Sequence, residues 1–271
     1  MEKKAAVPTL AHDRKNPNVT SRDSLATRLD LNARYASFDF HRWVLDRLAI
    51  QEGTDVLDVG CGNGAQALVA AKSVGRTGSV SAMDLSEKSI EELREKASDL
   101  SNIDAQVGDM KDLAQIIARD FKVKTYDLAY SIYALWYASD HIGVLEAMRQ
   151  SLKPGGRLIV CTPNYPNGLR ELVKRVGKPL PHLDQINNFG PNVLEPYLRT
   201  FFQQVTIHLR KNDLRIPTAD DAIKFYRATA YYAPDLEAVV RRHVQLEIET
   251  AGHFKFEKNN YLIVGEIPID G

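Results

Sequence analysis

The chain has 271 residues, of which 44% are hydrophobic and 26% are charged, so it is long enough to bury a sizeable core. Its 35 basic and 35 acidic residues cancel, which leaves no net field to attract nucleic acid or an anionic membrane. The two cysteines exclude a disulfide scaffold, and the seven histidines show no metal-ligand spacing. No apolar run approaches the ~18 residues of a membrane span, and the basic start lacks the apolar core of a secretory signal. We therefore expect a cytoplasmic globular protein.

The first part of the chain is polar and interrupted by prolines, and we expect a flexible arm over residues 1–30. Apolar residues then recur at helical spacing over 40–48, and Gly53 ends that helix. Strand-like and helix-like segments alternate from there. The expected strands are 55–59, 80–83, 103–107, 126–130 and 157–161, and the expected helices between them are 65–73, 87–98, 113–118 and 142–152. This alternation predicts an α/β fold, with a parallel sheet covered by helices on both faces.

The pattern changes after Cys161. Residues 163–190 are rich in Pro, Asn and Gly and are predicted to form a loop insert. The remaining expected elements are a helix over 193–202, a strand over 205–209, helices over 220–230 and 235–248, and a closing strand over 261–264. We interpret residues 31–271 as a single domain in which residues 213–252 form a helical lid over the site.

Three glycines, Gly60, Gly62 and Gly64, lie between the first strand and the first helix after it. Glycines there allow a tight turn and bring a ligand close to the free N–H groups of the helix N-terminus. A dinucleotide-binding fingerprint requires a third glycine at the position that Ala65 occupies. Asp58, at the strand end before the loop, would suit a ligand that carries an ammonium as well as a carboxylate.

Two further acids follow the next two strands. Asp84 ends the second strand, where a carboxylate can accept both hydroxyls of a ribose. Asp109 follows the third strand and could accept from an adenine amino group, while Met110 packs on the ring. Because these strands end at one edge of the sheet, the three loops are predicted to hold parts of a single nucleoside ligand.

With these motifs, the chain resembles the class I S-adenosylmethionine-dependent methyltransferases of the small-molecule branch. The resemblance rests on residues 57–64, Asp84, 108–110, 126–131 and 152–158. It implies S-adenosylmethionine as cofactor and a Rossmann-like sheet of seven strands, the last antiparallel and beside the sixth. It also implies cofactor contacts for Tyr35, Asp58, Gly60, Gly62, Gly64, Asp84, Leu85, Asp109, Met110 and Ser131.

The reaction that the resemblance implies is an in-line methyl transfer to a small organic acceptor, with oxygen favoured over nitrogen or carbon. Because the cofactor carries the reactive group, no catalytic side chain is required by the chemistry. His141 and Tyr133, which follow the fourth strand, are the catalytic candidates, and His182 in the loop insert is a weaker one. Tyr165, Phe225 and Tyr226 are the substrate-binding candidates.

Two other classes of function stay open at this stage. A nicotinamide (NAD)-dependent oxidoreductase would use Asp84 equally well, and only the glycine spacing and the lack of a second nucleotide-binding half argue against it. A non-catalytic cofactor-binding scaffold that regulates a partner enzyme is the other alternative. No metal ligands, nucleic-acid partner or membrane partner are expected, and a homodimer is left open.

Overall fold

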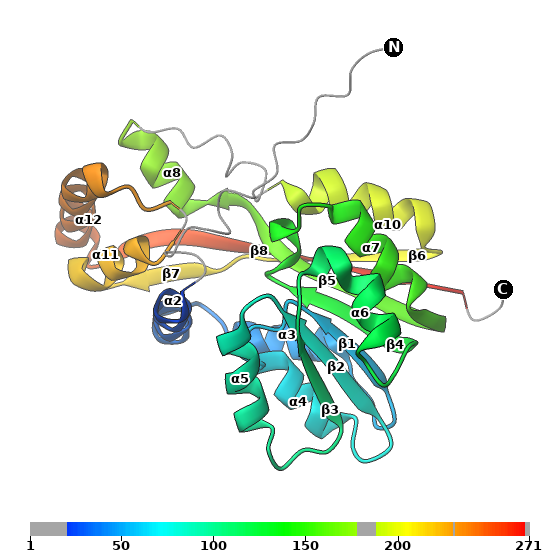
Figure 1. Ribbon diagram of the computed structural model, residues 1–271. Helices are drawn as coiled ribbons and strands as arrows, with labels where there is room; N and C mark the ends of the chain where they lie inside the picture. The colour runs from blue at the N-terminus through cyan, green and yellow to red at the C-terminus, as the bar shows by residue number, and fades with distance from the viewer. Residues whose placement is uncertain (1–20, 178–187, 230, 269–271) are drawn as a thin grey trace.

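A parallel sheet forms the centre of the molecule in the computed structural model, which describes residues 21–177, 188–229 and 231–268 (Figure 1). The strand order is β3-β2-β1-β4-β5-β8-β6, and β8 is antiparallel to both of its neighbours. The predicted mostly parallel sheet is thus confirmed, with an antiparallel last strand between the fifth and the sixth, although a further strand, described below, raises the count among the described residues from the predicted seven to eight. The strands of this order are β1 (Asp55–Val59), β2 (Ser79–Asp84), β3 (Ile103–Val107), β4 (Tyr126–Ile132), β5 (Leu152–Asn167), β6 (Gln204–Arg210) and β8 (Phe254–Glu266).

Helices cover both faces of this sheet, as the alternation predicted. One buried cluster contains residues from α3 (Phe40–Leu48), α4 (Ala65–Ser73) and α5 (Glu87–Lys96). The other contains residues from α6 (Leu113–Arg119), α7 (His141–Gln150) and α10 (Glu195–Phe201), which follows the π-helical turn η4 (Gly190–Leu194). Four of the five residues of β1 are buried, and three of these, Val56, Leu57 and Val59, are apolar, as expected for a strand covered on both faces.

Two strands extend well beyond the lengths that the sequence predicted. β5 has 16 residues and β8 has 13, and they pair with each other through residues 162–167 and 258–261. A strand that was not predicted, β7 (Asp213–Ile216), pairs with residues 254–257 of β8. We call residues 162–167, β7 and residues 254–261 the strand extension.

The prediction of a loop insert over residues 163–190 is wrong for its first part. Residues up to Asn167 belong to β5, and α8 (Gly168–Arg175) follows directly, while residues 178–187 lie outside the described part of the chain. Pro163 and Pro166 suggested a loop because proline cannot donate to a strand ladder. Pro163 pairs in register with Asn260, and the register shift between Asn164 and Asn167 accommodates Pro166.

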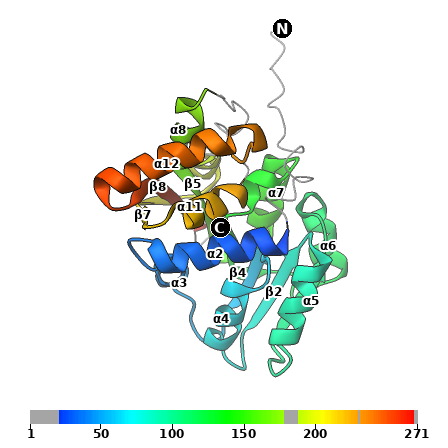
Figure 2. The ribbon, with the colours of Figure 1, turned by 90° about the vertical axis from the view of Figure 1, so that its left-hand side faces the viewer.

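Helix α2 (Arg22–Tyr35) occupies the end of the region predicted to be a flexible arm, so that prediction is wrong from residue 22 onward. The Ser21 hydroxyl caps the helix by accepting from the Ser24 N–H, and Leu31 is fully buried. Figure 2 shows α2 beside α11 (Ala219–Arg227), and the Arg28 guanidinium donates to the Ala228 carbonyl at 2.6 Å. The sequence showed no apolar stripe because this contact with α11, two hundred residues away, buries so few of its side chains.

The two helices predicted in the 213–252 segment are present. They are α11 and α12 (Glu237–Ala251), with the short turn η5 (Pro234–Leu236) between them. Both pack on the strand extension, at the end of the molecule to which β5 and β8 project (Figure 1).

Candidate cofactor and active site

The glycine loop between β1 and α4 has a backbone that only glycine adopts readily. Gly60, Gly62 and Gly64 have φ angles of +81°, +54° and +83°. A Cβ at Gly60 would lie 2.3 Å from the Ala134 Cβ, and one at Gly64 would lie 2.3 Å from a Leu93 methyl. A Cβ at Gly62 would meet no atom within 4 Å, so this glycine faces open space. The loop therefore packs tightly at its ends and exposes its backbone at the middle.

The N-terminus of α4 follows the loop without a side-chain cap. Its N-cap residue is Gly64, and no side chain accepts from the first N–H groups of the helix. Uncapped N–H groups and the helix dipole favour a carboxylate or another anion at this position.

Asp84, at the end of β2, is joined to the glycine loop by a hydrogen bond. Its Oδ2 accepts from the Gly62 N–H at 2.8 Å, and its Oδ1 accepts from the Ser86 N–H at 2.9 Å. Burial raises the pKa of this carboxyl, and the two backbone N–H groups oppose the shift. Each oxygen keeps a further lone pair, so the carboxylate can accept from two neighbouring hydroxyl groups, as a ribose requires. Leu85, which follows it, is 56% exposed.

The loop after β3 lies at the same edge of the sheet. The Met110 methyl carbon is 3.7 Å from the position of a Gly60 Cβ, so this side chain lies against the glycine loop. Asp109 caps the turn η2 (Met110–Asp112) by accepting from the Lys111 N–H at 3.1 Å. The structure thus brings Met110 to the predicted site and gives Asp109 a local structural role at its border.

Two buried polar groups lie in β1 and β4 close to the loop. Asp58 is 2% exposed and pairs in register with Tyr130, and burial raises its pKa to about 8. The Ser131 hydroxyl is fully buried and has no hydrogen-bond partner among the described residues. A buried carboxyl without an opposing charge among its described neighbours and a buried hydroxyl without a partner are both features that a polar, positively charged ligand would complete. Together with Asp84, this donor and acceptor set fits S-adenosylmethionine.

Tyr133, which follows β4, has a φ angle of +58°, a strained value for a tyrosine. Its hydroxyl donates to the Asn260 side-chain oxygen at 2.6 Å, and burial raises its pKa well above the ordinary value. The hydroxyl therefore stays protonated. The ring centroid lies 5.3 Å from those of both Phe40 and Trp136. Tyr133 thus forms an aromatic wall beside Ala134, which touches the glycine loop.

His141, the other catalytic candidate, begins α7. Its Nε2 lies 3.2 Å from the Trp136 carbonyl oxygen in the turn η3 (Leu135–Tyr137), and its ring lies 4.8 Å from that of Phe189. The structure therefore holds His141 against η3, whereas Tyr133 is held by β8. His182 lies outside the described residues.

The remaining candidates lie on the strand extension and its helices. The Tyr35 hydroxyl donates to Asp221 at 2.6 Å instead of reaching the glycine loop. Phe225 is buried against Phe256, with ring centroids 5.1 Å apart. The Tyr226 hydroxyl accepts from the Ala233 N–H at 2.9 Å, and Tyr165 is 48% exposed. The structure does not bring these four residues to the loop.

Three polar residues of β8, Lys258, Asn259 and Asn260, were missed because the sequence placed the start of this strand at residue 261. Asn260 holds the Tyr133 hydroxyl, and the Lys258 ammonium lies 5.1 Å from the centroid of the Tyr133 ring. The signal in the sequence that could have identified them is that these three polar residues directly precede the short apolar strand predicted over 261–264.

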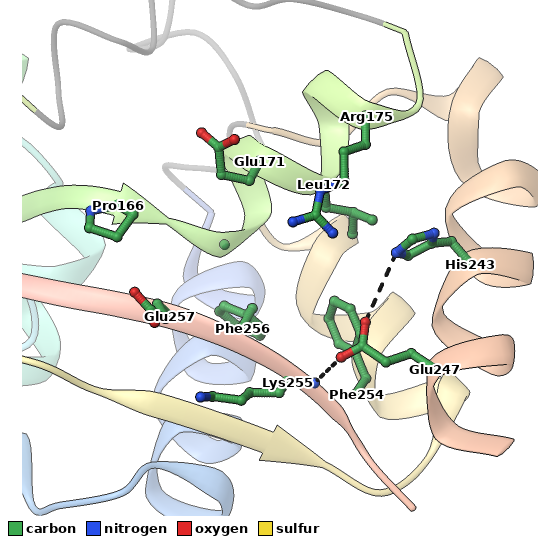
Figure 3. A pocket seen from close by; sticks show the side chains of 11 residues that line it. Pro166, Glu171, Leu172, Arg175, His243, Glu247, Phe254, Lys255, Phe256 and Glu257 are labelled. Atoms are coloured by element: carbon green, nitrogen blue, oxygen red, sulfur yellow. Dashed lines mark hydrogen bonds and ion pairs between the residues drawn. The ribbon is translucent and has the colours of Figure 1, made fainter. Parts of the chain in front are cut away.

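A pocket of about 340 Å³ lies between α8, α12 and β8 (Figure 3). Its charged side chains include His243, whose Nε2 is 3.9 Å from Glu247, and the Lys255 N–H donates to Glu247. None of its lining residues belongs to the glycine loop or to β1, β2 or β4, so the pocket is separate from the candidate cofactor site at the ends of these strands.

Within residues 21–177, 188–229 and 231–268, no three His, Cys, Asp or Glu side chains are grouped as metal ligands would be. No helix in the same ranges has the length and hydrophobicity that crossing a membrane would demand.

Comparison with known proteins gives the family. The methyltransferase domain family matches residues 50–196, more than half of the chain. A demethylmenaquinone methyltransferase of Staphylococcus aureus is 30% identical over 142 residues, which are 51% of this chain and 56% of that protein. The chain thus aligns with about half the length of the curated relatives it matches.

Solved structures share the fold. The YcgJ protein of Bacillus subtilis superposes with a TM-score of 0.56 at 17% identity, covering 84% of this chain and 97% of that one. The phosphoethanolamine N-methyltransferase 2 of Haemonchus contortus, solved with phosphomonomethylethanolamine and S-adenosylhomocysteine, gives 0.51 at 16% identity, covering 84% and 52%. With the glycine loop and Asp84 at the edge where this family binds its cofactor, the chain belongs to the class I S-adenosylmethionine-dependent methyltransferases.

Proposed function

We propose that this protein transfers a methyl group from S-adenosylmethionine to a small organic acceptor, with oxygen favoured as the acceptor atom over nitrogen or carbon. The observation that carries the proposal is the Asp84 carboxylate, which is bonded to the Gly62 N–H and keeps lone pairs for a ribose. The same bond argues against a nicotinamide dinucleotide. A pyrophosphate would need loop N–H groups such as that of Gly62, and this one already donates to a carboxylate.

Each part of the cofactor has a proposed partner at this edge. The N-terminus of α4 and the open face of Gly62 would receive the methionine carboxylate, and Asp58 would balance the ammonium. Asp84 would hold the ribose. Leu85, Asp109 and Met110 would border the adenine, and the unpaired Ser131 hydroxyl would lie toward the sulfonium. A contact from Tyr35 would require its hydroxyl to leave Asp221.

The bound cofactor supplies a methyl group on a positively charged sulfur, which the acceptor displaces in line. The task of the chain is to orient the two reactants, and orientation contributes up to ~7–11 kcal/mol to such reactions. The rings of Phe40, Tyr133 and Trp136 exclude water and present faces that favour a cation. For an oxygen acceptor, His141 would act as base after its Nε2 leaves the Trp136 carbonyl.

The 213–252 segment would serve as a lid. α11 is tied to α2 by the Tyr35–Asp221 hydrogen bond and by Arg28, so these two helices would close over the site together.

Calorimetric titration of the protein with S-adenosylmethionine, S-adenosylhomocysteine and NADH tests the proposal. We expect the first two to bind and NADH not to bind. Asp84→Asn keeps the shape of the side chain but loses the charge, and it should weaken cofactor binding by about 10–100-fold, or about 1.4–2.8 kcal/mol. Asp120→Asn, which removes a partly buried carboxylate paired with the exposed Arg119 far from the glycine loop in sequence, is the matched control. NADH binding, or unaltered cofactor affinity in Asp84→Asn, would overturn the assignment.

A further inference from the structure

Lys258 is a partly buried cation for which the described residues provide no counter-charge. Its Nζ donates to the Asn32 side-chain oxygen at 3.3 Å and lies 5.1 Å from the centroid of the Tyr133 ring. No carboxylate of the described residues pairs with it, whereas Lys255, three residues earlier on the same strand, is 3.0 Å from Asp213. Keeping an ammonium away from water without an opposing charge is unfavourable.

A second cation lies beside it. The Arg28 guanidinium projects from α2, one helical turn before Asn32. Its positive charge repels that of Lys258. Burial lowers the pKa of Arg28, and burial together with Arg28 lowers the pKa of Lys258 to about 8. His41 on α3 faces the same region, and its pKa is lowered by burial, with a further contribution from Lys258. Lys258 and Arg28 thus bring two positive charges close together beside Asn32.

The region around Lys258 lies next to the glycine loop, where we expect the methyl transfer to take place. The Lys258 ammonium lies near the Tyr133 ring, and the next residue, Ala134, is the one that a Gly60 Cβ would touch. Ser131, expected near the sulfonium, is two residues before Tyr133 on the same strand end. An acceptor lying along the Tyr133 wall could therefore reach the glycine-loop edge with one end and Lys258 with the other.

We infer that Lys258, with Arg28 beside it, binds an oxyanion group of the acceptor, a carboxylate or a phosphate, and so selects anionic over neutral or cationic acceptors. The inference rests on the proposed function, since it names the acceptor class of the same site. An oxyanion supplies the charge that Lys258 lacks, and it relieves the repulsion between Lys258 and Arg28. A cationic amine would add to that repulsion.

The test is calorimetric binding of three probes to the protein saturated with S-adenosylhomocysteine. The probes are benzoate, phenyl phosphate and the neutral benzamide, whose ring suits the aromatic wall. We expect at least one of the two anions to bind tenfold or more tightly than benzamide. The relative affinity of benzoate and phenyl phosphate shows whether the site prefers a carboxylate or a phosphate.

Variants assign the effect to Lys258. Lys258→Gln and Lys258→Met should each lose the preference for the anion, Lys258→Arg should keep most of it, and the control Lys255→Gln should leave it intact. Anion affinity should also fall as the pH rises from 7 to 9, because Lys258 loses its proton in that range while Arg28 stays charged. His41 is already neutral there, and the Tyr133 hydroxyl and the Cys161 thiol stay protonated because burial raises their pKa values.

Neither anion binding more tightly than benzamide, no binding of any probe, or anion binding that survives both Lys258→Gln and Lys258→Met would overturn the inference. Cofactor binding separates this failure from that of the proposed function, because the Lys258 variants should bind S-adenosylhomocysteine as the wild type does. If S-adenosylhomocysteine does not bind at all, the proposed function fails, and the same probes titrated into the unliganded protein still decide the role of Lys258.

Discussion

Gly60 and Gly62 both have positive φ angles, but a side chain at Gly60 would clash with its neighbours, whereas one at Gly62 would enter open space. Substituting each glycine therefore tests the packing of the loop and its binding of the cofactor separately. Gly60→Ala would place a methyl group against Ala134 in addition to the left-handed strain, and it should destabilise the fold by about 2–4 kcal/mol. Gly62→Ala adds only the backbone strain, about 1 kcal/mol, yet it projects a methyl into the open face. Cofactor affinity in Gly62→Ala should therefore fall at least tenfold while the protein remains folded. Urea unfolding and calorimetry measure the two quantities, and normal binding by Gly62→Ala would show that the loop does not receive the cofactor.

Asp58 should make the free energy of unfolding fall as the pH rises, because its carboxyl is buried in the folded protein. Its carboxyl holds its proton up to a pKa of about 8 in the folded state, but loses it near ~4 when unfolded. Unfolding between these values releases a proton, so the contribution of Asp58 is full below pH 4 and is lost as the pH rises through 8. Relative to Asp58→Asn, the wild type should lose about 1.4 kcal/mol per pH unit across this window. Urea unfolding of both proteins from pH 5 to pH 8 measures the difference, and a constant difference would contradict the burial of an ionisable group here.

At the residue scale, the sequence predicted what is encoded locally. The spacing of Gly60, Gly62 and Gly64 and the position of Asp84 follow from two adjacent βα units, and the structure brings them within a hydrogen bond of one another. Lys258 and Asn260 were not predicted, because they reach Tyr133 only through pairing of strands about a hundred residues apart in the chain. The substrate-binding role of Phe225 and Tyr226 stays a prediction, because an aromatic pair on an amphipathic helix has the same pattern whether it covers a ligand or a core, and both rings are buried.

At the scale of elements, strands β1 and β3 and helix α4 match their predicted bounds, whereas the strand extension and α2 were missed. β7 and the start of β8 alternate buried and charged residues, as Leu214-Arg215-Ile216 and Phe254-Lys255-Phe256 show. This period of two is typical of a strand with one buried face, so the signal was present but short. α2 carries no comparable signal, because its stability depends on docking against α11 and β7.

Leu31 tests whether α2 is an integral element. It is fully buried, so Leu31→Ala should destabilise the protein by about 2–5 kcal/mol through lost burial and the cavity it leaves. Asp30→Ala, on the exposed side of the same helix, removes only a surface ion pair with Arg34 and should cost less than about 1 kcal/mol. Urea unfolding compares the two variants with the wild type. An unchanged stability in Leu31→Ala would mean that α2 contributes nothing to the folded core.

At the scale of the whole molecule, β5 and β8 connect the cofactor edge to the helices of the strand extension. Both strands run from the central sheet into the extension without interruption, and one buried cluster contains residues from α6 and α7 as well as from α11 and α12. A shared sheet and a shared core favour a single cooperative unit over two domains joined by a linker. The position of Lys258 depends on this continuity, because it sits on β8 where the extension meets the sheet.

We therefore predict one unfolding transition that responds to both ends of the molecule. S-adenosylhomocysteine at 100 times its Kd should stabilise the whole protein by about 2.7 kcal/mol, although its proposed contacts lie only at the edge of β1, β2 and β4. Far-ultraviolet circular dichroism and the fluorescence of Trp43 and Trp136, which lie in the clusters on opposite faces of the sheet, should report the same midpoint. Leu31→Ala should lower that midpoint, and the ligand should raise it in the variant by the same amount as in the wild type. A second transition that moves with Leu31→Ala but not with the ligand would contradict this prediction, because α2, α11 and α12 would then unfold separately from the sheet.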